Sequence, residues 1–287
     1  MNNLVGLNCL ITGTSRGLGR QLAGAFWDEG ASLFLVARST KILSDLAEHL
    51  PSRVGQQMHC FGADLEDPSA PDLVVAAARD AFGRLDVLVN NAGIQGPIGH
   101  FWENDWAAWH ATFQVNFLSP AALCKACVQW MAENRGGKII NLSGGGAASP
   151  RPNFTAYAAS KAALVRFSET LAEETRSLGI EINCIAPGGM NTAMQDAILK
   201  AGPELAGQRE FELAREASRA VPDRVERAIA LCQFLASHAS DGITGKLLSA
   251  LWDPWEQLPE HLAELDKTDI YTLRRIVPRD RGCDWGG

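Results

Sequence analysis

The sequence lacks a long apolar run and an excess of basic residues, and each absence excludes a class of protein. No apolar stretch approaches the roughly 20 residues that a membrane-spanning helix requires, so we expect no membrane partner. Lys and Arg total 26 against 33 Asp and Glu, which gives a net charge of −7. Because proteins that bind nucleic acid are normally basic, we expect no nucleic-acid partner. The first residues show no basic segment followed by an apolar one, so we predict no secretory signal and a cytoplasmic location.

The seven cysteines do not form the even set that a disulfide framework requires. Most of them lie in apolar runs, which is typical of free thiols in a reducing cytosol. Cys124 and Cys127 have the spacing of a metal or redox pair, but no second Cys or His pair lies near them. We interpret them as buried thiols. Since the six histidines show no metal-ligand spacing either, we predict no metal site.

What the sequence does contain is a regular alternation of short apolar runs and helical stretches. Strands that are apolar throughout and alternate with helices predict a parallel sheet covered on both faces. The apolar runs span residues 7–12, 32–37, 58–62, 85–90, 138–142 and 181–185, and long helical stretches are expected over 105–133 and 156–178. The predicted fold class is therefore α/β, a single-domain doubly wound parallel sheet of the Rossmann type.

No stretch rich in Pro, Gly or Ser divides the chain, so we expect one catalytic domain over residues 1–250. A polar helical stretch over 195–219 departs from the alternation, and we interpret residues 190–220 as a lid over the substrate. Residues 251–287 form a C-terminal extension that we expect to pack on or between subunits. Its four arginines either form a solvated, salt-bridged cluster or meet an anionic substrate or a neighbouring subunit.

A glycine-rich turn follows the first apolar run and opens the first helical stretch. Glycines let the backbone turn sharply and approach a ligand closely. A helix N-terminus presents free N–H groups and a partial positive charge to a phosphate. The segment is either a simple turn or the pyrophosphate site of a dinucleotide, and its place between strand and helix favours the second. The residues concerned are Gly13, Ser15, Arg16, Gly17, Leu18 and Gly19.

The end of the second apolar run indicates which nicotinamide dinucleotide binds. An acidic residue there would hold the ribose 2′-hydroxyl of NAD, but this run continues into Arg38 and Ser39. Arg38 can pair with a 2′-phosphate, and Arg16 in the turn can help. The alternative is that both arginines are merely solvated. We predict NADP(H) rather than NAD(H).

The chain has only two tyrosines, and one of them stands at the start of a helical stretch in a chemically suggestive position. Tyr157 and Lys161 are four residues apart, so they share a helix face. A phenol titrates near pH ~10, and a neighbouring ammonium stabilises the phenolate and lowers its pKa. Such a tyrosine can exchange a proton with an alcohol or carbonyl oxygen near neutral pH, although surface neighbours often show the same spacing.

Together these motifs resemble the short-chain dehydrogenase/reductase family. The resemblance covers about residues 5–250 and adds Asp64 and Leu65 after the third strand, Asn90 to Gly93 after the fourth, and Pro187, Gly188 and Thr192 after the sixth. It implies that Tyr157 is the general acid/base, that Lys161 lowers the pKa of Tyr157 and holds the nicotinamide ribose, and that Asn116 anchors a water in the proton relay. It also implies cofactor contacts from the following residues: Asp64, Leu65, Asn91, Ala92, Gly93, Tyr157, Lys161, Pro187, Gly188 and Thr192.

The sequence departs from the family pattern at the position of a usual catalytic serine, thirteen residues before the tyrosine. This position is Gly144, and Ser143 lies one residue earlier. Either a small loop shift brings Ser143 to the substrate oxygen, or the substrate, a water or a backbone N–H supplies that hydrogen bond. Ser149 and Thr155 are weaker candidates. Near the end of the fold, residues 242–248 resemble the last strand of the family, without the usual pair of glycines after it.

The sequence therefore predicts an NADP(H)-dependent oxidoreductase that interconverts a carbonyl and a secondary alcohol. The substrate is expected among residues 94–102, 144–154 and 190–219, where Phe101, Trp102 and Trp106 either stack on it or pack among themselves. Two alternatives stay open: a catalytically weak NAD(P)-binding sensor or scaffold of the same fold, and an enzyme acting on an activated sugar or a ring ketone. The resemblance further implies a homodimer or homotetramer packed through the long helices.

Overall fold

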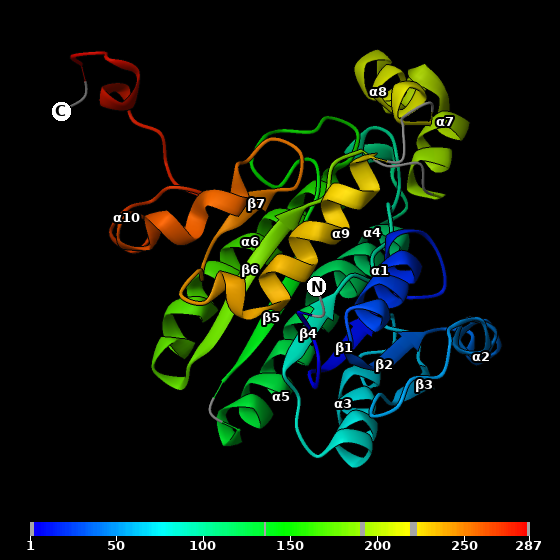
Figure 1. Cartoon of the computed structure of the whole chain (residues 1–287). Coiled ribbons are helices and arrows are strands. Elements are labelled where there is room, and N and C mark those ends of the chain that lie inside the picture. The colour runs from blue at the N-terminus through cyan, green and yellow to red at the C-terminus, as the bar shows by residue number, and fades with distance from the viewer. Residues whose placement is uncertain (1–2, 135, 190–192, 219–222, 286–287) are drawn as a thin grey trace.

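A seven-stranded parallel sheet with helices on both faces forms the body of the molecule (Figure 1). The computed structural model describes residues 3–134, 136–189, 193–218 and 223–285. The strand order is β3-β2-β1-β4-β5-β6-β7, and every neighbouring pair is parallel. The predicted doubly wound α/β fold is confirmed. The order reverses between β1 and β4, and in sheets of this kind ligands bind at the carboxyl ends of the strands near that point.

The strands agree with the predicted apolar runs to within two residues, except for the last. Their bounds are β1 Asn8–Thr12, β2 Ser32–Ala37, β3 Met58–Gly62, β4 Val87–Asn90, β5 Gly137–Leu142, β6 Ile180–Ala186 and β7 Leu247–Ser249. The helices are α1 Gly17–Asp28, α2 Thr40–His49, α3 Ala70–Phe82, α4 Trp106–Phe113, α5 Ser119–Glu133, α6 Thr155–Thr175, α7 Ala193–Ala206, α8 Gln208–Ser218, α9 Asp223–Ala236 and α10 Leu262–Lys267.

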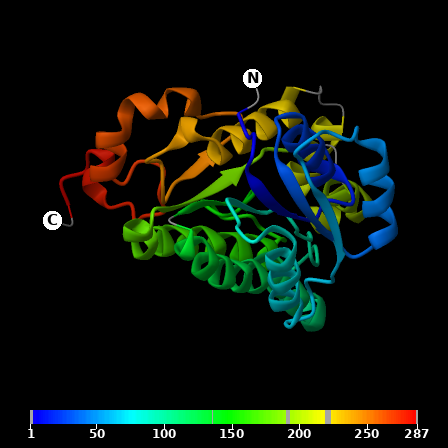
Figure 2. The same ribbon diagram turned by 60° about the horizontal axis from the view of Figure 1, so that its bottom comes forward.

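Alternate side chains of each central strand enter opposite cores, because successive residues of a strand point to opposite faces. Cys9 and Ile11 pack with α1, α2 and α9, whereas Leu10 packs with α3, α5 and α6. Figure 2 shows these two helical layers above and below the sheet. Because both faces are covered, the central strands are apolar along their whole length, which is why the sequence displays continuous runs instead of alternation.

The long helical stretch predicted over 105–133 is divided by a wider turn. α4 and α5 are joined through a π-helical turn, η2, over Gln114–Leu118. Pro120 lies at the start of α5 and has no N–H to give to the carbonyl of Asn116, four residues earlier. A π-turn of this kind marks many functional sites, and here it contains Asn116.

Two further segments differ in detail from the prediction. The stretch expected as one helix over 195–219 forms α7 and α8, and α7 is itself kinked at Gly202 (φ 75°) before Pro203. The strand expected over 242–248 is shorter, because β7 begins only at Leu247. Lys246 points instead toward the C-terminal extension, where its ammonium donates to the carbonyls of Leu265 and Ile270 at 2.7 and 3.1 Å.

Candidate active site

The proton-transfer pair predicted from the sequence lies on the first two turns of α6. The side chains of Tyr157 and Lys161 are both buried, at 7% and 3% exposure. Tyr157 packs with Phe154 and with Ile198, Ala206 and Ala214 of α7 and α8, the helices within the segment predicted to form a lid. The phenol side chain therefore lies between the sheet and these two helices and is almost fully shielded from solvent.

Lys161 reaches from α6 to the end of β5. Its ammonium donates to the carbonyl of Leu142 at 2.7 Å and lies 5.8 Å from the centre of the Tyr157 ring. Burial lowers the pKa of Lys161 to about 8, partly offset by the Cys184 thiol. Burial also raises the pKa of Tyr157, and Arg151 is the group that lowers it. The expectation that Lys161 lowers the pKa of Tyr157 stays a prediction.

Asn116 is held rigidly by the backbone of the segment after β4. Its carboxamide accepts from the N–H of Ile94 at 2.8 Å and donates to the carbonyl of the same residue at 2.9 Å. It also lies 3.2 Å from the hydroxyl of Ser160 on α6. A Cβ at Gly93 would lie 3.2 Å from the Asn116 oxygen and 3.6 Å from the Lys161 nitrogen. The structure thus brings the polar ends of Asn116 and Lys161 together beside Gly93.

Gly144 lies directly against the phenol oxygen. A Cβ at this position would stand 2.3 Å from the Tyr157 Oη, which is far inside contact distance. Ser143 is buried, and its hydroxyl has no hydrogen-bond partner among the described residues. Its backbone N–H pairs with the carbonyl of Ile185, which fixes it at the end of β5. Of the weaker candidates, Thr155 accepts a bond from the Trp109 indole at 3.3 Å and Ser149 is exposed.

Arg151 is a residue of the site that sequence reasoning missed. Its guanidinium centre lies 4.1 Å from the Phe154 ring centre and 5.4 Å from that of Tyr157. It forms an ion pair with Glu210 of α8 at 2.8 Å, and both side chains are largely buried. The three glycines over 144–146, separated from Arg151 by four residues in the sequence, were a local signal, because glycines leave room for a neighbouring side chain.

The glycine-rich turn has the shape of a phosphate cradle. A Cβ at Gly19 would meet the carbonyl oxygen of Gly13 at 2.3 Å, and one at Gly13 would meet the backbone of Ala92 at 2.7 Å. Asn91 closes the turn by donating to the carbonyls of Thr12 and Gly13 at 2.9 and 3.2 Å. α1 begins beside it without a side-chain cap, so its first N–H groups are available. The residues present therefore fit a pyrophosphate group.

The other predicted cofactor residues line the same edge of the sheet. Arg16 and Arg38 are exposed, at the start of α1 and just after β2.

The remaining predicted cofactor residues are held by local contacts or by their backbone conformation. Ser39 caps α2 by accepting from the N–H of Ile42, and the Asp64 carboxylate accepts from the N–H of Glu66. Gly17 has φ 57° and Gly188 has φ 86°, both in the region that favours glycine. Ser15 and Pro187 are half-buried, Leu18 and Leu65 are buried, and Thr192 lies outside the described residues.

The aromatic residues proposed for substrate stacking are largely solvent-exposed. Trp102 is 76% exposed and stacks on His100, with ring centres 4.7 Å apart. Trp106 is 62% exposed and stacks on Trp109 at 5.1 Å. Phe101 is half-exposed. Trp102 and Trp106 therefore stack on neighbouring rings of the chain in this structure.

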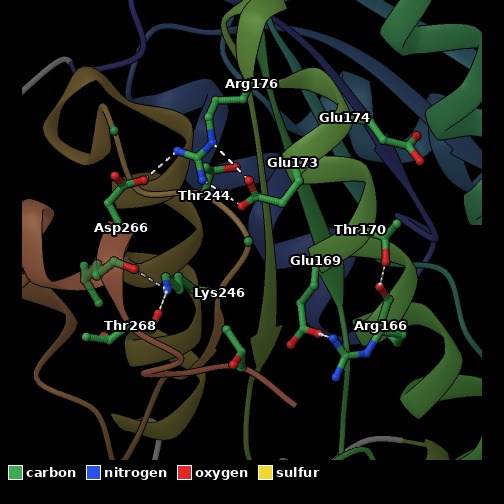
Figure 3. Close-up of a pocket in the computed structure, with 14 residues that line it drawn as sticks. Arg166, Glu169, Thr170, Glu173, Glu174, Arg176, Thr244, Lys246, Asp266 and Thr268 are labelled. Carbon is green, nitrogen blue, oxygen red and sulfur yellow. Dashed lines mark hydrogen bonds and ion pairs between the residues drawn. The ribbon is translucent and has the colours of Figure 1, made fainter. Parts of the chain in front are cut away.

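A cavity of about 460 Å³ lies between α6 and the C-terminal extension and is lined by many charged and polar residues (Figure 3). Several of its charges are paired with one another: Arg176 pairs with Glu173 and Asp266, and Arg166 pairs with Glu169. The Glu169 carboxylate also accepts from the backbone N–H of Leu273 at 2.6 Å. The cavity therefore lies at the interface between α6 and the C-terminal extension, and these contacts attach the extension to the helix.

Over the residues that the structure describes, no helix is both long and apolar enough to cross a lipid bilayer. Within the same residues, no three His, Cys, Asp or Glu side chains converge as metal ligands would. All seven cysteines are free. Cys124 and Cys127 are fully buried, and burial raises the pKa of Cys124 to about 12. This supports the interpretation of the pair as inert buried thiols.

Comparison with known proteins places the chain among enzymes of one family. The family model described as short chain dehydrogenase matches residues 8–202. The chain is 34% identical over 250 residues to the oxidoreductase UcpA of Escherichia coli, covering 85% of this chain and 93% of that protein. It is 31% identical over 248 residues to the 3-oxoacyl-[acyl-carrier-protein] reductase FabG of Vibrio cholerae, covering 86% and 96%.

Solved structures agree with the sequence matches. Levodione reductase superimposes with a TM-score of 0.76 at 26% identity, covering 86% of this chain and 96% of that one. A putative short-chain alcohol dehydrogenase from Sinorhizobium meliloti gives a TM-score of 0.71 at 28% identity, covering 87% and 96%. The chain therefore belongs to the short-chain dehydrogenase/reductase family, whose enzymes are oxidoreductases that bind NAD or NADP.

Proposed function

We propose that this enzyme interconverts a carbonyl compound and a secondary alcohol, using NADP(H), with Tyr157 as the general acid/base. The observation that carries the proposal is the buried phenol beside Gly144, with the ammonium of Lys161 and the carboxamide of Asn116 converging at Gly93. The glycine cradle at β1 lies at the same edge of the sheet and suits a dinucleotide. The names of the relatives, an oxoacyl reductase and a levodione reductase among them, are consistent with carbonyl chemistry.

In the reductive direction Tyr157 donates its phenolic proton to the carbonyl oxygen as that oxygen gains negative charge. When bound, the nicotinamide supplies the hydride to the carbonyl carbon. Burial raises the pKa of Tyr157, so the phenol stays protonated at neutral pH and is ready to act as the acid. Lys161, fixed by the Leu142 carbonyl, supplies positive charge nearby, and Asn116 holds the backbone at Ile94 in place. In the reverse direction the phenolate takes the proton of the alcohol.

The experiment that tests the proposal is coenzyme consumption with a panel of aldehydes, ketones and keto-sugars, followed with NADPH and with NADH. We expect reduction of at least one class of carbonyl, with NADPH preferred. A panel that gives no turnover with either coenzyme, while both bind, would favour the sensor or scaffold alternative.

The choice of coenzyme gives a prediction at Arg38. Replacement by alanine removes the cation proposed to pair with the 2′-phosphate, and a charge-assisted hydrogen bond contributes about 1.5–3 kcal/mol. We expect Arg38→Ala to raise the KM for NADPH about 10-fold or more and to leave the KM for NADH nearly unchanged. Arg53→Ala is the control. Arg53 lies between α2 and β3 and is already paired with Asp28 at the end of α1, so we assign it no contact with the coenzyme. Equal effects on both coenzymes would contradict the prediction.

Ser143 is proposed as the hydroxyl that replaces the missing family serine. Its buried oxygen has no hydrogen-bond partner in the part of the chain that the structure describes, and an unpaired buried hydroxyl is costly unless a ligand engages it. We expect Ser143→Ala to lower kcat about 10²–10³-fold, as loss of an oxyanion donor does elsewhere, with Ser149→Ala near wild type. Unchanged turnover in Ser143→Ala would exclude the hydroxyl from catalysis.

The proposal includes an oligomer and a cytoplasmic location. An apolar hollow lined by Ala121, Ala122 and Val128 of α5 and by Phe167 and Leu171 of α6 supports packing of a second copy against these helices. Size-exclusion chromatography with light scattering measures the assembly. The free thiols support a reducing compartment.

A further inference from the structure

We propose that Arg151 is a positioning residue for the phenol: Glu210 on the lid helix α8 holds its guanidinium beside Tyr157, so that the lid fixes the charge around the proton-transferring group. The inference rests on the proposed role of Tyr157. Its test reads the phenol itself, however, and does not require turnover.

The geometry places Arg151 closer to the ring than the family lysine. The Arg151 guanidinium centre lies 5.4 Å from the Tyr157 ring centre, against 5.8 Å for the Lys161 ammonium. The same guanidinium lies 4.1 Å from the ring centre of Phe154, within the range of a cation–π contact. The phenol therefore has one cation from its own helix and a second from the loop between β5 and α6.

The ion pair with Glu210 explains why the guanidinium stays there. The Nε of Arg151 donates to a carboxylate oxygen of Glu210 at 2.9 Å, and the Nη2 lies 2.8 Å from the same oxygen in an ion pair. The two side chains are only 13% and 19% exposed, so solvent screens the pair less than it screens a surface pair. Because Glu210 belongs to α8, this contact joins the lid to the loop that carries Arg151.

One glycine of the run over 144–146, Gly146, allows the close approach of Arg151. A Cβ at Gly146, which has φ 95°, would stand 3.1 Å from the Arg151 Cβ. A Cβ at Gly145 would lie 3.9 Å from the Arg151 Nε. The run therefore lies along the arginine on one side, while Gly144 lies against the phenol oxygen on the other.

Two charged groups lie near the phenol ring, Lys161 from α6 and Arg151 from the loop between β5 and α6. Glu210 from α8 lies behind Arg151 and is paired with it. A nearby positive charge stabilises the phenolate and opposes the effect of burial. The pKa of Tyr157 is accordingly raised by burial and lowered by Arg151. If the guanidinium is removed, less positive charge offsets the effect of burial on the phenol, so we expect the pKa of Tyr157 to rise.

The chain offers a direct experiment because it contains only two tyrosines. In a Tyr271→Phe background Tyr157 is the single tyrosine, and its ionisation is followed by ultraviolet absorbance against pH while circular dichroism monitors folding. We expect Arg151→Met to raise the pKa of Tyr157 by about one pH unit and Arg151→Lys to recover most of that rise. Glu210→Gln should raise it as well, because the guanidinium is then no longer held in place.

Arg227→Met is the matched control. Arg227 also lies over an aromatic ring, 5.2 Å from the centre of Trp255, and also pairs with a glutamate, Glu256, at 2.8 Å. An equal effect of Arg227→Met, or an unchanged pKa of Tyr157 in Arg151→Met, would overturn the proposal. An unchanged or lowered pKa in Glu210→Gln would overturn the part assigned to the lid.

In an active enzyme, the pH at which kcat/KM for alcohol oxidation rises should move upward in Arg151→Met by the same amount.

Discussion

Replacement of Tyr157 by phenylalanine is expected to lower kcat by about 10²–10⁴-fold, the range that general acid–base catalysis contributes. The substitution removes one oxygen from a buried side chain and keeps the ring that packs with Phe154 and the lid. The fold and the cradle around Gly13 and Gly19 are untouched, so the Kd for NADPH should change little. Steady-state kinetics and fluorescence titration of the coenzyme measure the two quantities separately.

Tyr271→Phe is the control for this variant, since it removes the only other phenol of the chain. It should keep full turnover. If Tyr157→Phe retained most of the wild-type rate, the phenol would not be the proton donor, and the enzyme would need another acid. If wild type and variant both bound the coenzyme and neither turned over, the sensor alternative would gain support.

Restoring the serine of the family at position 144 is expected to impair the enzyme, contrary to what the resemblance alone suggests. Any Cβ at this position would stand 2.3 Å from the Tyr157 Oη, so the phenol or the loop must move. A displacement of about 1 Å can cost 10²-fold in rate. We expect Gly144→Ala and Gly144→Ser each to lower kcat/KM about 10²-fold.

The neighbouring glycine provides the control for this clash. A Cβ at Gly145 meets nothing closer than 3.9 Å, an ordinary contact, so Gly145→Ala should stay within about threefold of wild type. A gain of activity in Gly144→Ser would contradict the clash and would mean that the loop adapts to place the hydroxyl on the substrate.

The sheet could be predicted because its determinants are local. Each central strand is apolar throughout since both faces are covered, and each helix carries its own periodicity. The pairing of Tyr157 with Lys161 was likewise predictable, because four residues on a helix fix a shared face. The predicted doubly wound fold and the family membership are both confirmed.

The rest depends on contacts between residues far apart in the chain. Arg151 acquires its position from Glu210, 59 residues later, and no local pattern announces that pair. The π-turn at Asn116 follows from Pro120, a local signal that the helical periodicity of the stretch concealed. The kink at Gly202 was visible as a glycine before a proline, but the segment was interpreted only as a polar helical stretch, without its internal break.

The attachment of the C-terminal extension has a consequence for how the protein unfolds. The Lys246 ammonium is held by the carbonyls of Leu265 and Ile270, and Trp255 and Leu258 belong to the same core as β1. Detachment of the extension would therefore expose a buried ammonium and open the core beside the sheet. We expect the extension and the sheet to melt together in one cooperative transition.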